Sequence, residues 1–269
     1  MENPFLGSDF QIRWTTLTPG HVVQAIEAAL ARAQDEIDAI ATRDVQTLTF
    51  ENTFLALEQA TEELNTAWCK VTHLQSVADS PSLREAHNQM LPLVTTFHAR
   101  IPLNAGLWDR LNSFAGTSAA ASSTGIRRRY LEETIKDFRQ AGAELPVEKR
   151  ARLESLQGEL AQLTQKYSEN VLDATNAWQL VVGPGDEHRL AGLPAHAKAA
   201  AQRGAAGKGV GGWRFTLQHP SLEPFLTYVE DRELRREMWE ASSAVGAQAP
   251  FDNTPLIGKI LALRAEKAA

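Results

Sequence analysis

One apolar pattern in the second half of the chain constrains the fold more than any other feature. Apolar and aromatic residues recur there every three or four positions, at Leu153, Leu156, Leu160, Leu163, Tyr167, Val171, Ala174 and Trp178. This spacing predicts one helix near 146–180, on the order of 50 Å long, with Pro146 at its start. Such a helix needs a long packing surface, because helix propensity alone does not hold it. We expect it to pack inside a large helical domain. The alternative is a coiled-coil dimer, although the flanking charges do not alternate as a zipper requires.

Most of the remaining sequence also has helical periodicity, so the predicted fold class is mainly all-α. Helices are expected over 18–40 after a Thr18-Pro19 start, 49–74, from Ser80-Pro81 through Met90, 125–142, 194–203, 221–229, 231–244 and 254–269. Pro92 and Pro102 are expected to kink or end helices. Residues 116–125 and the glycine tract 203–212 are expected to be loops.

Two short segments are the strand candidates, and they suggest how the chain is divided. Residues 178–182 and 213–218 are rich in aromatic and β-branched residues and are bounded by Gly and Pro, which predicts a small two-stranded antiparallel ribbon. We therefore expect a helical N-terminal domain over 1–180. Residues 181–269 would hold the ribbon, the Gly-rich loop and further helices.

Composition excludes several classes of function. The net charge of −6 argues against a nucleic-acid partner, since phosphate binding needs a positive surface. The run Arg127–Arg129 is an exception that is expected to be a solvated helix start. The N-terminus lacks the features of a signal peptide, and no stretch of about 18 apolar residues predicts a membrane span.

The single cysteine, Cys69, permits no intramolecular disulfide, which is typical of a reducing cytosol. His73 follows four residues later, so a Cys–His nucleophile pair is conceivable. A small buried thiol beside a packed histidine is the preferred interpretation, because free cysteine usually behaves as a core residue. His73 and His98 stand among apolar residues and are both expected to be core histidines.

No catalytic, cofactor-binding or metal-ligating residue is predicted in this chain. Seven histidines are present, and no two of them stand three or four residues apart, so the HExxH pattern of a zinc peptidase is absent. The glycines Gly207, Gly209 and Gly212 satisfy GxGxxG. However, a helical segment precedes them and a strand follows, the reverse of a dinucleotide site, so a flexible hairpin loop is expected. The adjacent pairs Glu62-Glu63 and Glu132-Glu133 point about 100° apart on a helix and are expected to be solvated.

The last predicted helix begins well, with Thr254 as N-cap and Pro255 at the next position. No Gly, Asn or Pro signal closes it before Ala269, and this pattern is typical of a cut chain.

Several segments, in order, resemble the N-terminal portion of the oligopeptidase A/thimet oligopeptidase family of zinc metallopeptidases, and in particular its bacterial oligopeptidase A branch. They are NPFL (3–6), LTPGHVVQAIEAAL (17–30), HLQSVADSPSLREAH (73–87), LTQKYSENVLDATNAW (163–178), DRELRREMWEASSA (231–244) and ILALRAEKAA (260–269). The resemblance covers essentially the whole chain. The tract 203–212 is richer in glycine than the resemblance leads us to expect, and is interpreted as a loop variation.

The resemblance implies a neurolysin-like N-terminal half of a cytoplasmic enzyme that cuts short peptides in a deep channel. In that family zinc is bound on the C-terminal half by the two HExxH histidines and a downstream Glu, so none of those positions can be placed on this chain. Residues 1–180 would supply one wall of the channel, and 181–269 would lead into the catalytic half. The implied partners are short peptides, without nucleic acid or membrane, and the chain alone is expected to be inactive, to bind no zinc and to self-associate through uncovered apolar surface. The alternatives are a stand-alone helical peptide-binding or interaction module and a structural protein that dimerises through 146–180.

Overall fold

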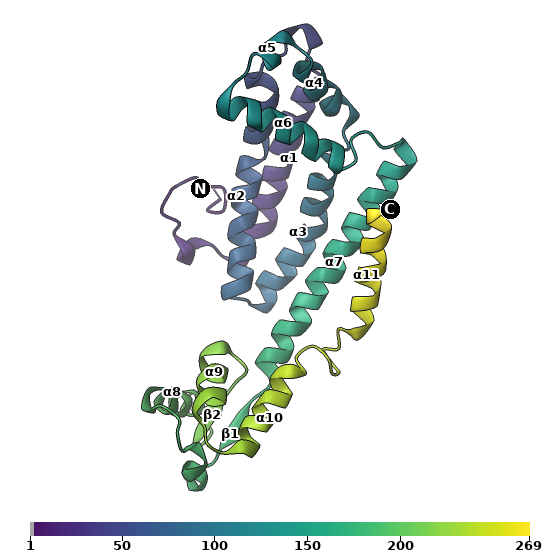
Figure 1. Ribbon diagram of the computed structural model, residues 1–269. Helices are drawn as coiled ribbons and strands as arrows, with labels where there is room; N and C mark the ends of the chain where they lie inside the picture. The colour runs from purple at the N-terminus through teal and green to yellow at the C-terminus, as the bar shows by residue number, and fades with distance from the viewer. Residues whose placement is uncertain (1–2) are drawn as a thin grey trace. The chain divides into compact units, whose positions relative to one another are not determined.

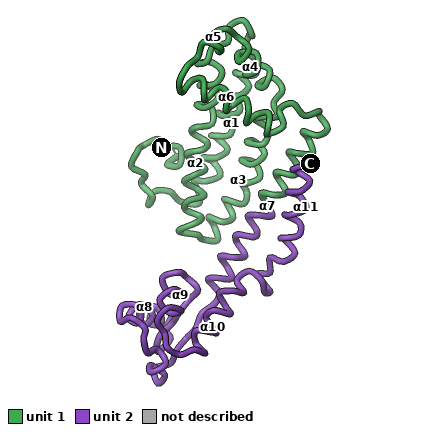
Figure 2. The backbone as a smooth tube through the Cα atoms, in the orientation of Figure 1, with its two compact units in different colours: residues 1–162 green, residues 163–269 purple. Residues whose placement is uncertain are grey.

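The protein is described here by a computed structural model that places residues 3–269. The chain separates into two compact units, the first ending at Gln162 and the second spanning Leu163–Ala269 (Figure 2). Helices account for 73% of the structure, and one small antiparallel ribbon is present among the described residues, so the predicted mainly all-α class is confirmed. The expected functional division at residue 180 stays a prediction.

The first unit is built from helices (Figure 1). They are α1 (Val22–Ala41), α2 (Ala56–Val77), α3 (Pro81–Arg100), α4 (Ala105–Ala115), α5 (Ser118–Ala121) and α6 (Gly125–Gln140). Short 3-10 turns at Trp14–Thr16, Pro19–His21 and Val45–Thr47 and a π-helical turn at Glu51–Leu55 precede some of them. The helices α1, α2 and α3 pack against one another, and α4 packs on α1 and α6.

Local capping explains where several of these helices begin. The Ser80 hydroxyl accepts a hydrogen bond from the amide of Leu83 at 3.3 Å, and Pro81 occupies the first helical position, so the predicted start of α3 is confirmed. The side-chain Oδ1 of Asn104 accepts in the same way from the amide of Leu107 at 3.0 Å. These caps satisfy backbone donors that have no partner inside the helix.

Several predicted details of the helices differ from the structure. Pro19 opens a 3-10 turn rather than α1, since the Thr18 hydroxyl bonds His21 Nδ1 at 3.0 Å and no Thr18 side-chain cap forms. Pro92 lies inside α3, which continues to Arg100, so of the two expected effects this proline does not end the helix. The segment 116–125 contains the short helix α5, and α8 continues to Ala206 into the expected glycine loop.

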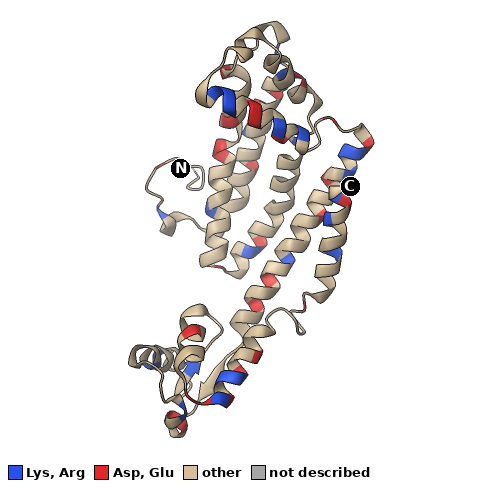
Figure 3. Cartoon of the chain, in the orientation of Figure 1, with Lys and Arg blue, Asp and Glu red and all other residues tan. Residues whose placement is uncertain are grey.

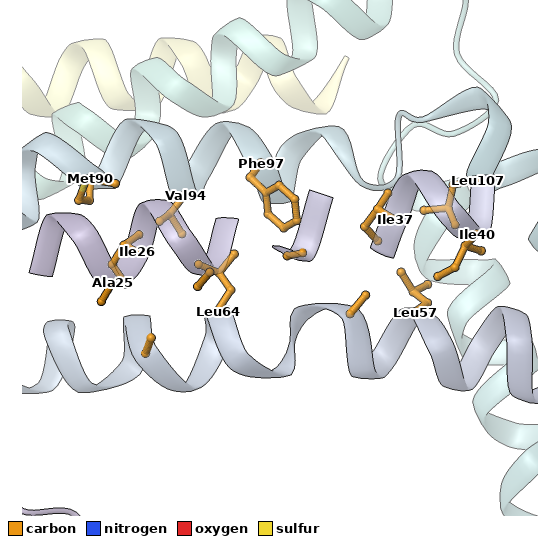
Figure 4. Close-up of a cluster of buried hydrophobic side chains, with 14 of the residues drawn as sticks. Ala25, Ile26, Ile37, Ile40, Leu57, Leu64, Met90, Val94, Phe97 and Leu107 are labelled. Atoms are coloured by element: carbon orange, nitrogen blue, oxygen red, sulfur yellow. The ribbon is translucent and has the colours of Figure 1, made fainter. Parts of the chain in front are cut away.

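The core of the first unit lies between α1, α2 and α3 and extends to α4 (Figure 4). One face of α1 points into this core, and Ile26, Ile37 and Ile40 on it are each at most 2% exposed. Leu64 on α2 and Met90 on α3 face the same cluster and are fully buried. At about 1.5–3 kcal/mol for each large apolar side chain, this burial is the main stabilising contribution in the unit.

The long helix predicted near 146–180 is observed as α7, Val147–Ala177. Arg150 anchors its start, because its guanidinium donates to the main-chain carbonyls of Leu145 at 2.7 Å and Leu103 at 3.1 Å. Of the apolar stripe that predicted α7, Leu156 is buried, whereas Tyr167 remains 38% exposed and the others are half-buried. The stripe therefore correctly predicted the helix but overestimated how completely this chain covers it.

The second unit contains the C-terminal part of α7 and further elements. They are β1 (Leu180–Val182), a 3-10 segment (Pro184–Leu190), α8 (Ala195–Ala206), β2 (Trp213–Phe215), α9 (His219–Tyr228), α10 (Arg232–Ser243) and α11 (Thr254–Ala268). The strands form the predicted antiparallel ribbon, with Leu180 opposite Phe215 and Val182 opposite Trp213. The helix α11 begins at Thr254 itself, so the expected Thr254 cap is one residue too late; Asp252 accepts from the Thr254 amide instead, at 2.8 Å.

A carboxylate at the start of α10 ties two segments of the second unit together. Asp231 caps α10, because its Oδ1 accepts from the amides of Glu233 at 3.0 Å and Leu234 at 3.1 Å. Its Oδ2 accepts from Arg189 Nε at 2.7 Å. The hydrogen bond from Arg189 is the main reason that the pKa of Asp231 lies below its ordinary value, and the Leu234 amide adds to it.

We expect Asp231→Ala to lower the free energy of unfolding by about 1–2 kcal/mol, and Asp231→Asn to lower it less because an amide oxygen still caps α10. The folded-state pKa of Asp231 lies below 3.8, so the contribution of its charge is present above that pH and is lost as the pH falls through the folded pKa. Urea unfolding from about pH 5 to about pH 2 should therefore show a smaller acid-dependent loss for Asp231→Asn than for the parent. Equal destabilisation by both variants at neutral pH would show that the cap contributes nothing.

Candidate functional site

The residues that the sequence singled out for possible chemistry form no cluster of metal ligands within residues 3–269. Across residues 3–269, the structure brings together no group of three or more His, Cys, Asp or Glu side chains that could hold a metal ion. The conceivable Cys69–His73 pair lies on the exposed side of α2. The prediction that no catalytic or metal-ligating residue occurs in this chain stays a prediction.

The interpretation of Cys69 as a buried thiol is wrong, because this residue is exposed. The inward face of α2 carries Leu64, Ala67 and Val71, and a position two residues from either Ala67 or Val71 points away from that face. His73 is also exposed rather than a core residue, and its ring lies 4.9 Å from that of Trp14.

Two other histidines are packed in α3, and one of them was missed. His98 is half-buried and contacts Phe97, and burial lowers its pKa. His87 is only 3% exposed and stacks on Trp68 with ring centroids 4.8 Å apart. Its position between Leu83 and Met90 on the apolar face of α3 was the signal that could have identified it.

The remaining motifs are consistent with their structural interpretations. The run Arg127–Arg129 is exposed at the start of α6, as expected, and Arg127 pairs with Glu51 at 2.7 Å. Positive and negative side chains are interspersed along both units (Figure 3). The GxGxxG glycines lie between α8 and β2, so the order of elements is the reverse of a dinucleotide site, as predicted.

A depression in the second unit combines an apolar wall with two carboxylates. Its volume is about 470 Å³, and its lining includes Trp178, Phe251, Glu237 and Glu240. Buried Asn253 holds the loop that forms one side, since its Nδ2 donates to the carbonyl of Tyr167 at 3.1 Å and its Oδ1 accepts from Asn170 at 2.9 Å. Nothing in the sequence pattern indicated Asn253, because its partners are more than 80 residues away.

A larger depression, of about 730 Å³, lies in the first unit beneath the N-terminal segment. Its lining includes Lys70 from α2, His21 from the 3-10 turn before α1, Gln24 from the first turn of α1, and Asp9 and Arg13 from the N-terminal segment. Lys70 was also missed, since a lysine in a helical stretch is ordinarily expected to be solvated. Both depressions offer charges, hydrogen-bonding groups and apolar walls, and this arrangement is suited to binding.

No helix among residues 3–269 has both the length and the apolar character needed to cross a bilayer. The chain is similar to oligopeptidases over all or most of its length. Oligopeptidase A of Haemophilus influenzae is 34% identical over 273 residues, covering 100% of this chain and 40% of the relative. Oligopeptidase A of Escherichia coli is 34% identical over 274 residues with the same coverage. Probable cytosolic oligopeptidase A of Arabidopsis thaliana is 31% identical over 219 residues, covering 79% of this chain and 31% of the relative.

The chain thus spans about 40% of the length of the bacterial relatives that it matches. The family described as Neurolysin/Thimet oligopeptidase, N-terminal domain, matches residues 23–150, which run from α1 to the start of α7. Together these matches confirm that the chain corresponds to the N-terminal portion of the oligopeptidase A/thimet oligopeptidase family.

Proposed function

We propose that residues 1–269 are the non-catalytic N-terminal part of a zinc-dependent metalloendopeptidase that hydrolyses short oligopeptides. The observation that carries this proposal is the 34% identity to bacterial oligopeptidases A over the entire chain, combined with the N-terminal domain match. The described residues do not fit a zinc ion, since no group of three potential ligands forms among them. The zinc ligands and the general base are therefore assigned to a catalytic half outside this chain.

In this proposal the helical part supplies a wall beside the peptide. The helices of residues 50–105 and the long helix α7 are the candidates for this wall or its support. Residues 181–269 connect the wall to the catalytic half. The proposed partners are short peptides rather than nucleic acid or membrane, and the proposed location is the cytoplasm.

The proposal is tested by comparing the 269-residue chain with a protein in which the same chain is joined to the rest of its gene product. We expect cleavage of an internally quenched peptide of about eight residues, and stoichiometric zinc by mass spectrometry, only in the longer protein. Loss of cleavage after zinc chelation and its return with added zinc would identify the metal. Sedimentation velocity of the short chain should show self-association, given the incompletely buried stripe of α7.

Two results would contradict the proposal. The first is zinc-dependent cleavage by the 269-residue chain that a substitution within residues 1–269 abolishes. The second is a longer gene product without an HExxH site. Binding of peptides by such a product would then favour the alternative of a helical peptide-binding module.

A further inference from the structure

A buried ammonium group marks the depression in the first unit. Lys70 is 5% exposed, and its Nζ donates to the main-chain carbonyls of Phe5 at 3.0 Å and Gly7 at 2.5 Å. An ammonium group has three donors, so these two bonds leave one. Lys70 forms no ion pair with any residue from 3 to 269; Asp9 acts on it only at longer range. A buried charge is normally paired, but residues 3–269 provide no ion-pair partner for this ammonium group.

The surroundings of Lys70 form a cavity rather than a closed core. The depression has a volume of about 730 Å³, which lies within the range of roughly 300–1,000 Å³ that is typical of small-ligand sites. The N-terminal segment, which lies beside α2, forms one side of it (Figure 1). Burial lowers the pKa of Lys70, and Asp9 opposes that effect, so the two charges act on each other within the depression.

The lining contains charges of both signs together with amides and apolar groups. Besides Lys70, it has a second cation in Arg13 and one carboxylate in Asp9. Neither Arg13 nor Asp9 uses its side chain in a hydrogen bond or ion pair with a residue from 3 to 269. Further lining residues that can bond or contact a ligand include Gln11, Gln24, Pro4, Ile12 and Leu17.

We propose that this depression binds a short peptide through its two charged ends. The terminal carboxylate would lie by Lys70 and Arg13, where it supplies the missing negative charge, and the terminal ammonium would lie by Asp9. The glutamine amides can bond the peptide group, and Ile12 and Leu17 can contact an apolar side chain. Inorganic phosphate matches this lining less well than a peptide does, because the Asp9 carboxylate would repel it. Phosphate would also make no contact with the apolar wall. This proposal is argued from the lining of the depression and does not depend on the proposed function.

The test uses the full-length gene product and the dipeptide Ala-Leu, with binding measured by calorimetry and by saturation-transfer NMR. We expect Arg13→Gln and Asp9→Asn each to weaken binding by about fivefold or more, because each removes one charge-assisted contact. Arg129→Gln is the matched control, since Arg129 is an exposed arginine of the same unit that does not line the depression, and it should leave binding unchanged. Ala-Leu with an amidated C-terminus should bind weakly to the parent and be insensitive to Arg13→Gln.

Several outcomes would overturn the proposal. Undetectable binding of Ala-Leu by the parent would do so, as would binding that Arg13→Gln and Asp9→Asn leave unchanged, because the dipeptide would then occupy another site. Tighter binding of inorganic phosphate than of Ala-Leu would show that the depression is an anion site instead. Lys70→Met is a secondary variant, since it also removes the two bonds that hold the N-terminal segment; circular dichroism must first show a folded protein.

Discussion

Replacement of Phe54 by alanine should lower the free energy of unfolding of the first unit by about 3–5 kcal/mol. Phe54 is 0% exposed and lies in the π-helical turn that precedes α2. Its ring centroid is 6.0 Å from that of Phe50, 5.9 Å from that of Phe114 and 6.4 Å from that of Tyr130. The substitution removes a buried ring and leaves a cavity between segments that the surrounding helices cannot readily close.

Urea unfolding followed by circular dichroism measures this loss. Ile126→Ala is the control, because Ile126 is 89% exposed and its truncation should change the free energy of unfolding by no more than about 0.5 kcal/mol. A loss for Phe54→Ala below about 1 kcal/mol would mean that the aromatic cluster relaxes around the cavity and does not organise this end of the unit. The hydroxyl of Tyr130 is an independent probe of the same aromatic cluster. Burial raises its pKa to about 12, and the hydrogen bond that it donates to Glu58 at 2.8 Å adds to this effect.

Gly212→Ala should destabilise the second unit by roughly 2–4 kcal/mol. Gly212 has φ +84°, and a Cβ at this position would lie 2.1 Å from the carbonyl oxygen of Val182. Val182 is the residue of β1 that pairs with Trp213 of β2, so the clash would separate the strands at the end of the ribbon. Both strands contribute buried side chains to the core of this unit, which is why a change at one glycine should extend beyond the loop.

Gly209→Ala separates the steric clash from the cost of the backbone conformation. Gly209 also has a positive φ, of +69°, but open space surrounds its Cβ position, so only the conformational cost of about 1–2 kcal/mol is expected. Hydrogen exchange of the β1 and β2 amides should accelerate markedly in Gly212→Ala and only slightly in Gly209→Ala. Equal effects of the two variants would show that the approach of Gly212 to Val182 does not limit stability. If the loop were flexible at both positions, neither Gly212→Ala nor Gly209→Ala would change the stability or the hydrogen exchange appreciably.

The sequence alone predicted most of the secondary structure, because the signals for it are local. The apolar period of three and four residues identified α1 and α7, and the Ser80-Pro81 pair located the start of α3. The two aromatic and β-branched segments predicted the ribbon of β1 and β2. The short segments that resemble the oligopeptidase A/thimet oligopeptidase family also indicated that family. They occur in the same order along the chain as in the family, and recognising this order requires no knowledge of tertiary contacts.

Only the tertiary structure decided which side chains are enclosed and what they contact. Burial depends on neighbours that are distant in sequence, so Cys69 proved exposed, whereas Lys70 proved buried beneath the carbonyls of Phe5 and Gly7. The buried bond between Asn170 and Asn253 joins residues 83 positions apart, and no local pattern records it. The apolar periodicity of a sequence predicts which face of a helix points inward. Whether a charged side chain near that face is buried depends on the segment that packs over it.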